Sequence, residues 1–178
     1  MLDVSREFVD TGVERYNRRY RKRDQLEERA IREWLTSLPE PKYLNKEYFV
    51  RLARWKTPRQ RSAYERNHEA RIIEATRLAY SALDPLVKMH VLIALEGVNV
   101  AVAACILHYL HPDRFPIFDI RARTTLKKQG MWNRRINDAS DKAWEDYISA
   151  MRQLSERLGV SLRELDKALF AYDKWGGE

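Results

Sequence analysis

The chain has 178 residues, and its 33 Lys and Arg side chains against 26 Asp and Glu give a formal charge of +7. The single cysteine, Cys105, excludes an internal disulfide framework, a four-cysteine zinc site and an iron–sulfur cluster held by four thiolates. The apolar fraction of 44% predicts a packed core, and the basic balance favours a polyanionic partner.

The apolar segments predict neither secretion nor membrane insertion. Residues 1–10, MLDVSREFVD, lack the apolar core of a signal peptide. The longest nearly apolar stretch, residues 98–107, is too short to span a bilayer. We therefore expect a soluble protein of a reducing compartment with no membrane partner. Its expected location is the cytoplasm, with nucleoid association if the source is bacterial.

Helical spacing of apolar residues is frequent, and no sustained alternation of period two occurs, so we expect an all-α fold. The expected architecture is a bundle of about eight helices in two small lobes. A broken apolar stripe predicts helix over residues 7–38, inside an N-terminal helical extension over residues 1–40. Asn45 is expected to cap the next helix, and residues 62–80 have an amphipathic pattern.

The second half of the chain carries clearer helix boundaries. Asp84-Pro85 combines a capping residue with a proline at the first helical position. Residues 99–110 are apolar on nearly every face, which is typical of a central buried helix. A further helix is expected over residues 140–158, and Ser161 with Glu164 forms a capping box at the start of the last one.

Basic side chains concentrate in three windows, residues 15–32, 42–77 and 114–135. Any one window is consistent with a solvated helix face, but three of them favour a polyanion as partner. Arginine predominates over lysine, and its planar fork suits phosphate oxygens. Three aromatic residues among these charges fit either stacking on bases or anchoring of the core: Trp55, Tyr64 and Trp132.

Residues 92–126, LIALEGVNVAVAACILHYLHPDRFPIFDIRARTTL, carry the most informative pattern. Gly97 is expected in a tight turn between two helices, because glycine permits positive φ and a close approach of backbone. Asn99 also tolerates positive φ and is expected to keep the turn. The N–H groups that open the second helix, together with its dipole, would form a phosphate site. The alternative is an ordinary helical hairpin with a glycine C-cap.

This pattern resembles the helix-hairpin-helix of the HhH-GPD superfamily of base-excision DNA glycosylases. In that family an apolar-x-Gly-apolar-Gly hairpin is followed by Ala four residues after the second Gly and an acidic residue about twenty residues after it. Here Asn99 takes the second Gly position, and Ala103 and Asp119 follow in register. From about residue 45 onward, the chain also resembles a bacterial group that shares a GVxVxxAxxIL…P-x-R-[FY]-P-I-x-D-x-R-A signature and an upstream WK-x-P-R.

The resemblance implies one HhH-GPD-like domain over residues 1–178, with the hairpin and the Asp loop in residues 84–126. It implies that Asp119 faces a flipped nucleotide, where a carboxylate stabilises positive charge on the sugar and helps to position water. Asp119 is also a natural N-cap for the helix after it. Ala101 stands where bifunctional members carry a nucleophilic Lys, so the expected enzyme is monofunctional and only hydrolyses the N-glycosidic bond.

DNA is the expected partner, and no protein partner is predicted. No cofactor is expected, apart from a monovalent cation that the hairpin could bind. Departures from the family pattern, Asn99 and Ala101 among them, leave open a non-catalytic nucleic-acid-binding protein on the same scaffold, and an all-α adaptor is a third alternative. His108 and His111 are too few ligands for a metal site. The candidate DNA contacts are Gly97, Val98, Asn99, Ala101, Arg121 and Arg123, and the candidates for a base pocket or wedge are Trp55, Lys56 and Arg59.

Overall fold

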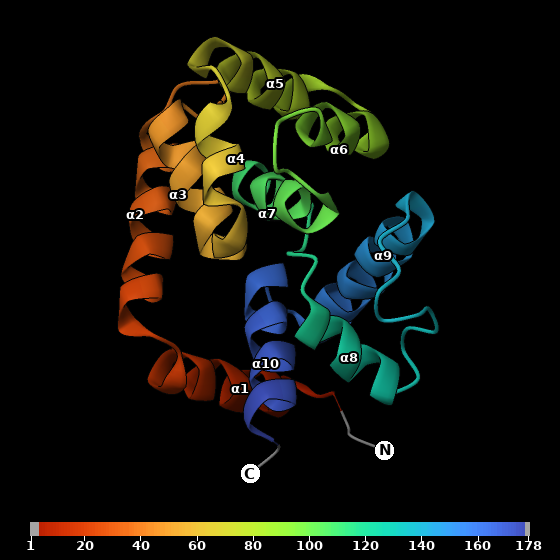
Figure 1. Ribbon diagram of the computed structural model, residues 1–178. Helices are drawn as coiled ribbons and strands as arrows, with labels where there is room; N and C mark the ends of the chain where they lie inside the picture. The colour runs from red at the N-terminus through yellow and green to blue at the C-terminus, as the bar shows by residue number, and fades with distance from the viewer. Residues whose placement is uncertain (1–3, 177–178) are drawn as a thin grey trace. The chain divides into compact units, whose positions relative to one another are not determined.

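A computed structural model describes residues 4–176, and every regular element in that range is helical (Figure 1). This confirms the all-α prediction. Besides the short 3-10 helix η1 (Pro58–Gln60), the described residues form ten α-helices. They are α1 (Arg6–Arg19), α2 (Lys22–Ser37), α3 (Lys46–Lys56), α4 (Arg61–Arg66), α5 (Glu69–Ser81), α6 (Pro85–Ile93), α7 (Val100–Leu110), α8 (Ile120–Lys128), α9 (Asp141–Leu158) and α10 (Leu162–Trp175).

The helix count exceeds the expected eight because two predicted helices are each divided. The first division lies at Tyr20, whose extended backbone (φ −75°, ψ 147°) ends α1 before α2 begins. The second lies at Asn67, which is extended (φ −65°, ψ 131°) between α4 and α5. Neither position carries the glycine or proline that ordinarily signals a helix end.

The chain divides into two compact units, which are described separately. One unit contains residues 1–20 and 112–178, and the other contains residues 21–111. The division falls inside the 1–40 segment and inside the 84–126 segment. The predicted hairpin therefore belongs to the 21–111 unit, whereas Asp119 belongs to the discontinuous unit.

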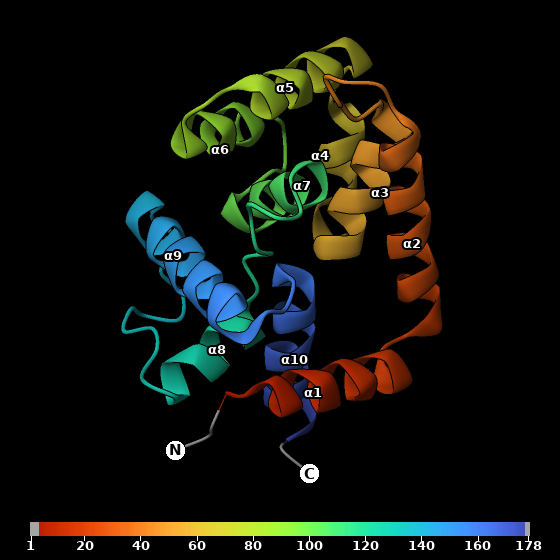
Figure 2. The same cartoon turned by 180° about the vertical axis from the view of Figure 1, so that it is seen from behind.

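In the discontinuous unit, α10 is the central element and packs against α1, α8 and α9. The contact of α1 with α10 depends on Gly12, because a Cβ there would lie 2.6 Å from the Ala168 Cα. Figure 2 shows the resulting crossing of the two helices. Buried aliphatic and aromatic side chains complete this core, and Phe115 stacks on Trp144 with ring centroids 5.8 Å apart.

In the 21–111 unit, α7 is the buried central helix, as the sequence predicted. Nine of its 11 residues, from Val102 to Leu110, are buried, and Cys105 lies among them. The helix contacts α2, α3, α5 and α6, with α3 and α4 on one side and α5 and α6 on the other (Figures 1 and 2). Within residues 4–176, no helix combines the length and apolar character that crossing a membrane requires.

The predicted helix caps are confirmed at four positions. Asn45 accepts a hydrogen bond from the Tyr48 N–H, and Asp84 accepts from the N–H groups of Leu86 and Val87. Asp119 caps α8, and Ser161 and Glu164 form both hydrogen bonds of the capping box. These caps satisfy N–H groups that have no acceptor inside their helices.

The capping box at α10 predicts a pH-dependent contribution to stability. The Ser161 N–H donates to the Glu164 carboxylate at 2.7 Å, and this bond is the main reason that the pKa of Glu164 is lowered. Glu164→Ala should cost about 1 kcal/mol of unfolding free energy at pH 7. A lowered folded-state pKa gives stability above the unfolded pKa and loses it as pH falls through the folded value. Urea titrations should show the cost shrinking below about pH 4, and a constant cost from pH 7 to 3 would contradict this.

Candidate nucleic-acid interface and acidic site

The turn between α6 and α7 requires a glycine at position 97. Gly97 has φ +80°, which L side chains rarely adopt. A Cβ on Gly97 would also lie 2.8 Å from the Ala63 Cβ and 3.0 Å from two ring carbons of Tyr64. The conformation and the close approach to α4 therefore both exclude a side chain at this position.

Asn67 holds this turn against the end of α4. Its side chain is fully buried, and its Oδ1 accepts from the Glu96 N–H at 2.8 Å while its Nδ2 donates to the Glu96 carbonyl at 3.0 Å. An ion pair between Arg66 and the Glu96 carboxylate, at 2.7 Å, adds a second link. The sequence did not predict this role of Asn67, because its partner Glu96 lies 29 residues away and no local pattern marks the contact.

Asn99 keeps the hairpin in a different way from the one predicted. Its backbone is extended, with φ −108°, and every positive φ among residues 4–176 belongs to a glycine, so the expected positive φ is wrong. Instead, its Oδ1 accepts from the Val102 N–H at 3.1 Å and caps α7. Asparagine is among the best N-cap residues, which explains its place here. The N–H groups of Val100 and Ala101 remain in the first turn, where α7 offers no acceptor.

Asp119 is the N-cap of α8, as predicted, and its side chain is half-buried. It follows Phe115 to Phe118, four buried residues in extended or irregular backbone. Its Oδ1 accepts from the Arg121 N–H at 2.9 Å, and this bond fixes the orientation of the carboxyl group. The carboxylate therefore lies at the positive end of the α8 dipole.

Arg121 and Arg123 both make contacts within the protein that the sequence did not predict. The Arg121 guanidinium pairs with Asp173 of α10 at 3.1 Å. Arg123 is only 6% exposed, its Nη1 donates to the Asp138 carbonyl at 2.9 Å, and burial lowers the pKa of its guanidinium. Because Arg123 is buried, its side chain is not available for the expected surface contact with phosphate.

The aromatic residues among the basic windows are mainly core anchors. Tyr64 is fully buried, with its hydroxyl donating to the Thr57 carbonyl at 3.1 Å, and Trp132 is 3% exposed. Neither ring is therefore available to stack on a base. Trp55 is half-buried at the end of α3, and its Nε1 donates to the Asp24 carbonyl at 3.1 Å.

The candidate residues separate into two groups by unit. The hairpin residues share the 21–111 unit with the end of α3, where Lys56 is half-buried and Arg59 is exposed in η1. The discontinuous unit holds Asp119 with its neighbours Arg121 and Arg123.

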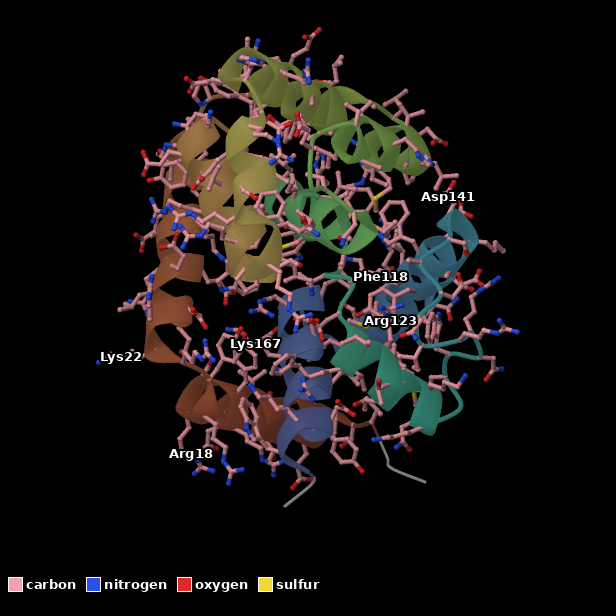
Figure 3. All side chains as sticks on the ribbon, viewed as in Figure 1. Arg18, Lys22, Phe118, Arg123, Asp141 and Lys167 are labelled. Carbon is pink, nitrogen blue, oxygen red and sulfur yellow. The ribbon has the colours of Figure 1, made fainter. Side chains whose placement is uncertain are left out.

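The basic windows differ in how far acidic side chains neutralise them. In residues 42–77, Arg51, Arg61 and Arg66 each pair with a glutamate at 3.1 Å or less. By contrast, a tract at the end of α1 and the start of α2 is exposed and has no ion pair among the described residues. Figure 3 shows Arg18 on α1 and Lys22 on α2, each extending away from its own helix. The members of this basic tract are Arg18, Arg19, Arg21, Lys22 and Arg23.

The two histidines of α7 and its C-cap lie in different surroundings. His108 is buried, whereas the ring of His111 stacks on Tyr80 at 4.6 Å and its Nε2 lies 3.2 Å from the Lys88 Nζ. Within residues 4–176, no group of three or more His, Cys, Asp and Glu side chains is arranged to hold a metal ion.

Comparisons with known proteins do not place the chain in a family. No family model matches it, and neither the curated proteins nor the solved structures include a match. A functional proposal therefore depends on the side chains described above.

Proposed function

We propose that the protein is a monofunctional DNA glycosylase of the HhH-GPD type, which acts on a damaged or modified base in cytoplasmic DNA. The observation that carries the proposal is the half-buried Asp119 carboxylate at the start of α8, twenty residues after Asn99. Breaking an N-glycosidic bond develops positive charge on the sugar, and a fixed carboxylate stabilises that charge. The carboxylate needs no reorganisation, because the Arg121 N–H already orients it.

The proposed reaction is hydrolysis of a base that has been flipped out of the duplex. Water adds to the anomeric carbon, the base leaves with its bonding electron pair and takes up a proton, and an abasic site remains. Ala101 has no amine to form a Schiff base with the sugar, so the strand is not cut by elimination.

Contacts with DNA are assigned to the hairpin and to the basic tract. The N–H groups of Val100 and Ala101 and the dipole of α7 suit one phosphate. The exposed side chains of the basic tract suit several more, because no acidic neighbour among the described residues neutralises them. Trp55, Lys56 and Arg59 remain the candidates for contact with the flipped base or the gap that it leaves.

Base excision is tested with duplexes that carry single oxidised, alkylated, deaminated or methylated bases. The protein is incubated with each duplex, and alkali then cleaves any abasic site. We expect one class of duplex to be cut only after alkali, because the protein itself does not break the strand. Strand cleavage without alkali would contradict the monofunctional assignment.

The basic tract predicts a steep dependence of DNA binding on salt. A protein with six or more phosphate contacts loses about 10³-fold in affinity between about 50 and 200 mM salt. Arg18→Ala and Lys22→Ala should each lower the slope of log Kd against log salt by about one. Arg61→Ala is the matched control, because that exposed arginine already pairs with Glu65 at 2.7 Å. A flat salt response would remove DNA as partner and favour the adaptor alternative.

A non-catalytic nucleic-acid-binding protein is the second candidate, and Asn99 favours it. The Asn99 Oδ1 accepts a hydrogen bond from the Val102 N–H, so one donor of the hairpin is already satisfied within the protein. Binding to DNA with steep salt dependence, without base release from any duplex of the panel, would select this candidate over the enzyme.

A further inference from the structure

The backbone just before Asp119 is tied to a buried tyrosine of α9. Tyr147 is fully buried, and its hydroxyl donates to the Ile117 carbonyl at 3.1 Å. The same carbonyl accepts the Asp119 N–H at 2.8 Å. One oxygen therefore links the Tyr147 side chain to the backbone of the residue that carries the carboxylate.

Phe118 fills the space beside this link and contacts two different elements. Its ring meets the Tyr147 ring edge to face, with centroids 5.2 Å apart. The Arg123 guanidinium lies 3.9 Å from the centre of the same ring, and Figure 3 shows the two side chains side by side. The backbone N–H of Arg123 also donates to the backbone carbonyl of Asp119 at 3.0 Å. The residues before and after Asp119 are thus held by one buried cluster.

Burial of Tyr147 favours the neutral form of its phenol. Burial, followed by the charges of Asp166 and Asp119, raises the pKa of Tyr147 well above its ordinary value. A neutral phenol donates its proton, so the bond to the Ile117 carbonyl persists at every pH at which the protein would act. Inside a low-dielectric core such a bond is a rigid restraint.

We propose that Tyr147 is a positioning residue for the Asp119 carboxylate, acting through the Ile117 carbonyl while Phe118 and Arg123 pack beside it. The inference rests on the proposed function, since it assigns Tyr147 a role in the same site. A carboxylate must stay within a fraction of an ångström of the developing charge, and small displacements weaken its effect strongly. Tyr147 provides that restraint without touching the substrate.

The test uses a probe that does not require knowledge of the damaged base. A duplex carries a pyrrolidine nucleotide, whose ring nitrogen is cationic at neutral pH and imitates the charged sugar. A second duplex carries the neutral tetrahydrofuran analogue, and the ratio of the two Kd values measures recognition of the cation. We expect wild type to prefer the cationic duplex, Asp119→Asn to lose the preference, and Tyr147→Phe to reduce it by about 10-fold.

A second step separates positioning from a general loss of structure. In the Asp119→Asn background, Tyr147→Phe should have no further effect on the ratio, because its effect passes through that carboxylate. Tyr16→Phe is the matched control: this phenol is also buried in the discontinuous unit, where it accepts a bond from the Arg163 Nη2 at 3.2 Å. It removes the same atom from a phenol of α1 that packs against Phe170 and Arg163 of α10, and it should leave the ratio unchanged.

The outcomes distinguish the inference from the function on which it rests. If wild type shows no preference for the cationic duplex, the proposed function and the inference both fail. If Asp119→Asn abolishes the preference but Tyr147→Phe retains it, only the positioning role fails. If Asp119→Asn retains part of the preference, and Tyr147→Phe lowers that remainder by the same factor as it lowers the wild-type ratio, the positioning role also fails. Should Tyr147→Phe not fold, Phe118→Leu replaces it: a reduced ratio supports the cluster, and an unchanged ratio refutes it.

Discussion

Asp119→Asn should reduce the rate of base release by about 10²–10³-fold under single-turnover conditions while leaving the fold intact. The loss follows from removing the negative charge that stabilises the developing cation. The fold should survive because an asparagine Oδ1 accepts the Arg121 N–H as an aspartate Oδ1 does, and the two residues are equivalent N-caps. Affinity for an undamaged duplex should stay equal or rise, since a charge that repels phosphate has gone.

Asp84→Asn provides a control with the same chemical change at another helix. Asp84 caps α6 with its Oδ1 on the N–H groups of Leu86 and Val87, at 2.8 and 3.0 Å. Both variants therefore replace a capping carboxylate by an amide, and they differ only in the helix that the residue caps. Base release by Asp84→Asn should match wild type. If Asp119→Asn excises the base as fast as wild type, the assignment of Asp119 is wrong.

The helix starts were predictable because their determinants are local. Asn45, Asp84, Asp119 and Ser161 each bind an N–H two or three residues later in the chain. The buried character of α7 was equally visible, because apolar residues cover nearly every face of that helix and leave no polar stripe. In each case the interaction spans less than one turn or depends only on composition.

The features that escaped prediction depend on contacts distant in sequence. The break between α4 and α5 occurs where the Asn67 side chain binds both backbone groups of Glu96, in addition to the Ala63 and Tyr64 carbonyls of α4. Arg123 resembles the other arginines of its basic window, but the rings of Phe118 and Trp132 accept its guanidinium in the interior. A charge count treats such a residue as surface, because only the packed structure reveals what covers it.

Gly97→Ala should lower the free energy of unfolding by about 2–4 kcal/mol. Two costs add: an L residue is strained at φ +80°, and the new Cβ meets the Ala63 Cβ at 2.8 Å and the Tyr64 ring at 3.0 Å. Urea unfolding measures the sum. DNA affinity should fall as well, because the turn that presents the start of α7 must shift.

Two further variants separate these costs. Gly130→Ala has a similar φ, +70°, but nothing within 4 Å of the added Cβ, so it should cost only the conformational part, about 1–2 kcal/mol. In the Gly97→Ala variant, the methyl group nearest to the new Cβ is that of Ala63, and Ala63→Gly removes it. The free energy of unfolding of the double variant should therefore be about 1 kcal/mol higher than the sum of the single changes predicts. Strict additivity would show that the close approach of α4 does not limit residue 97. The glycine requirement would then come from backbone conformation alone, and Gly97→Asn, which tolerates positive φ, would restore most of the stability.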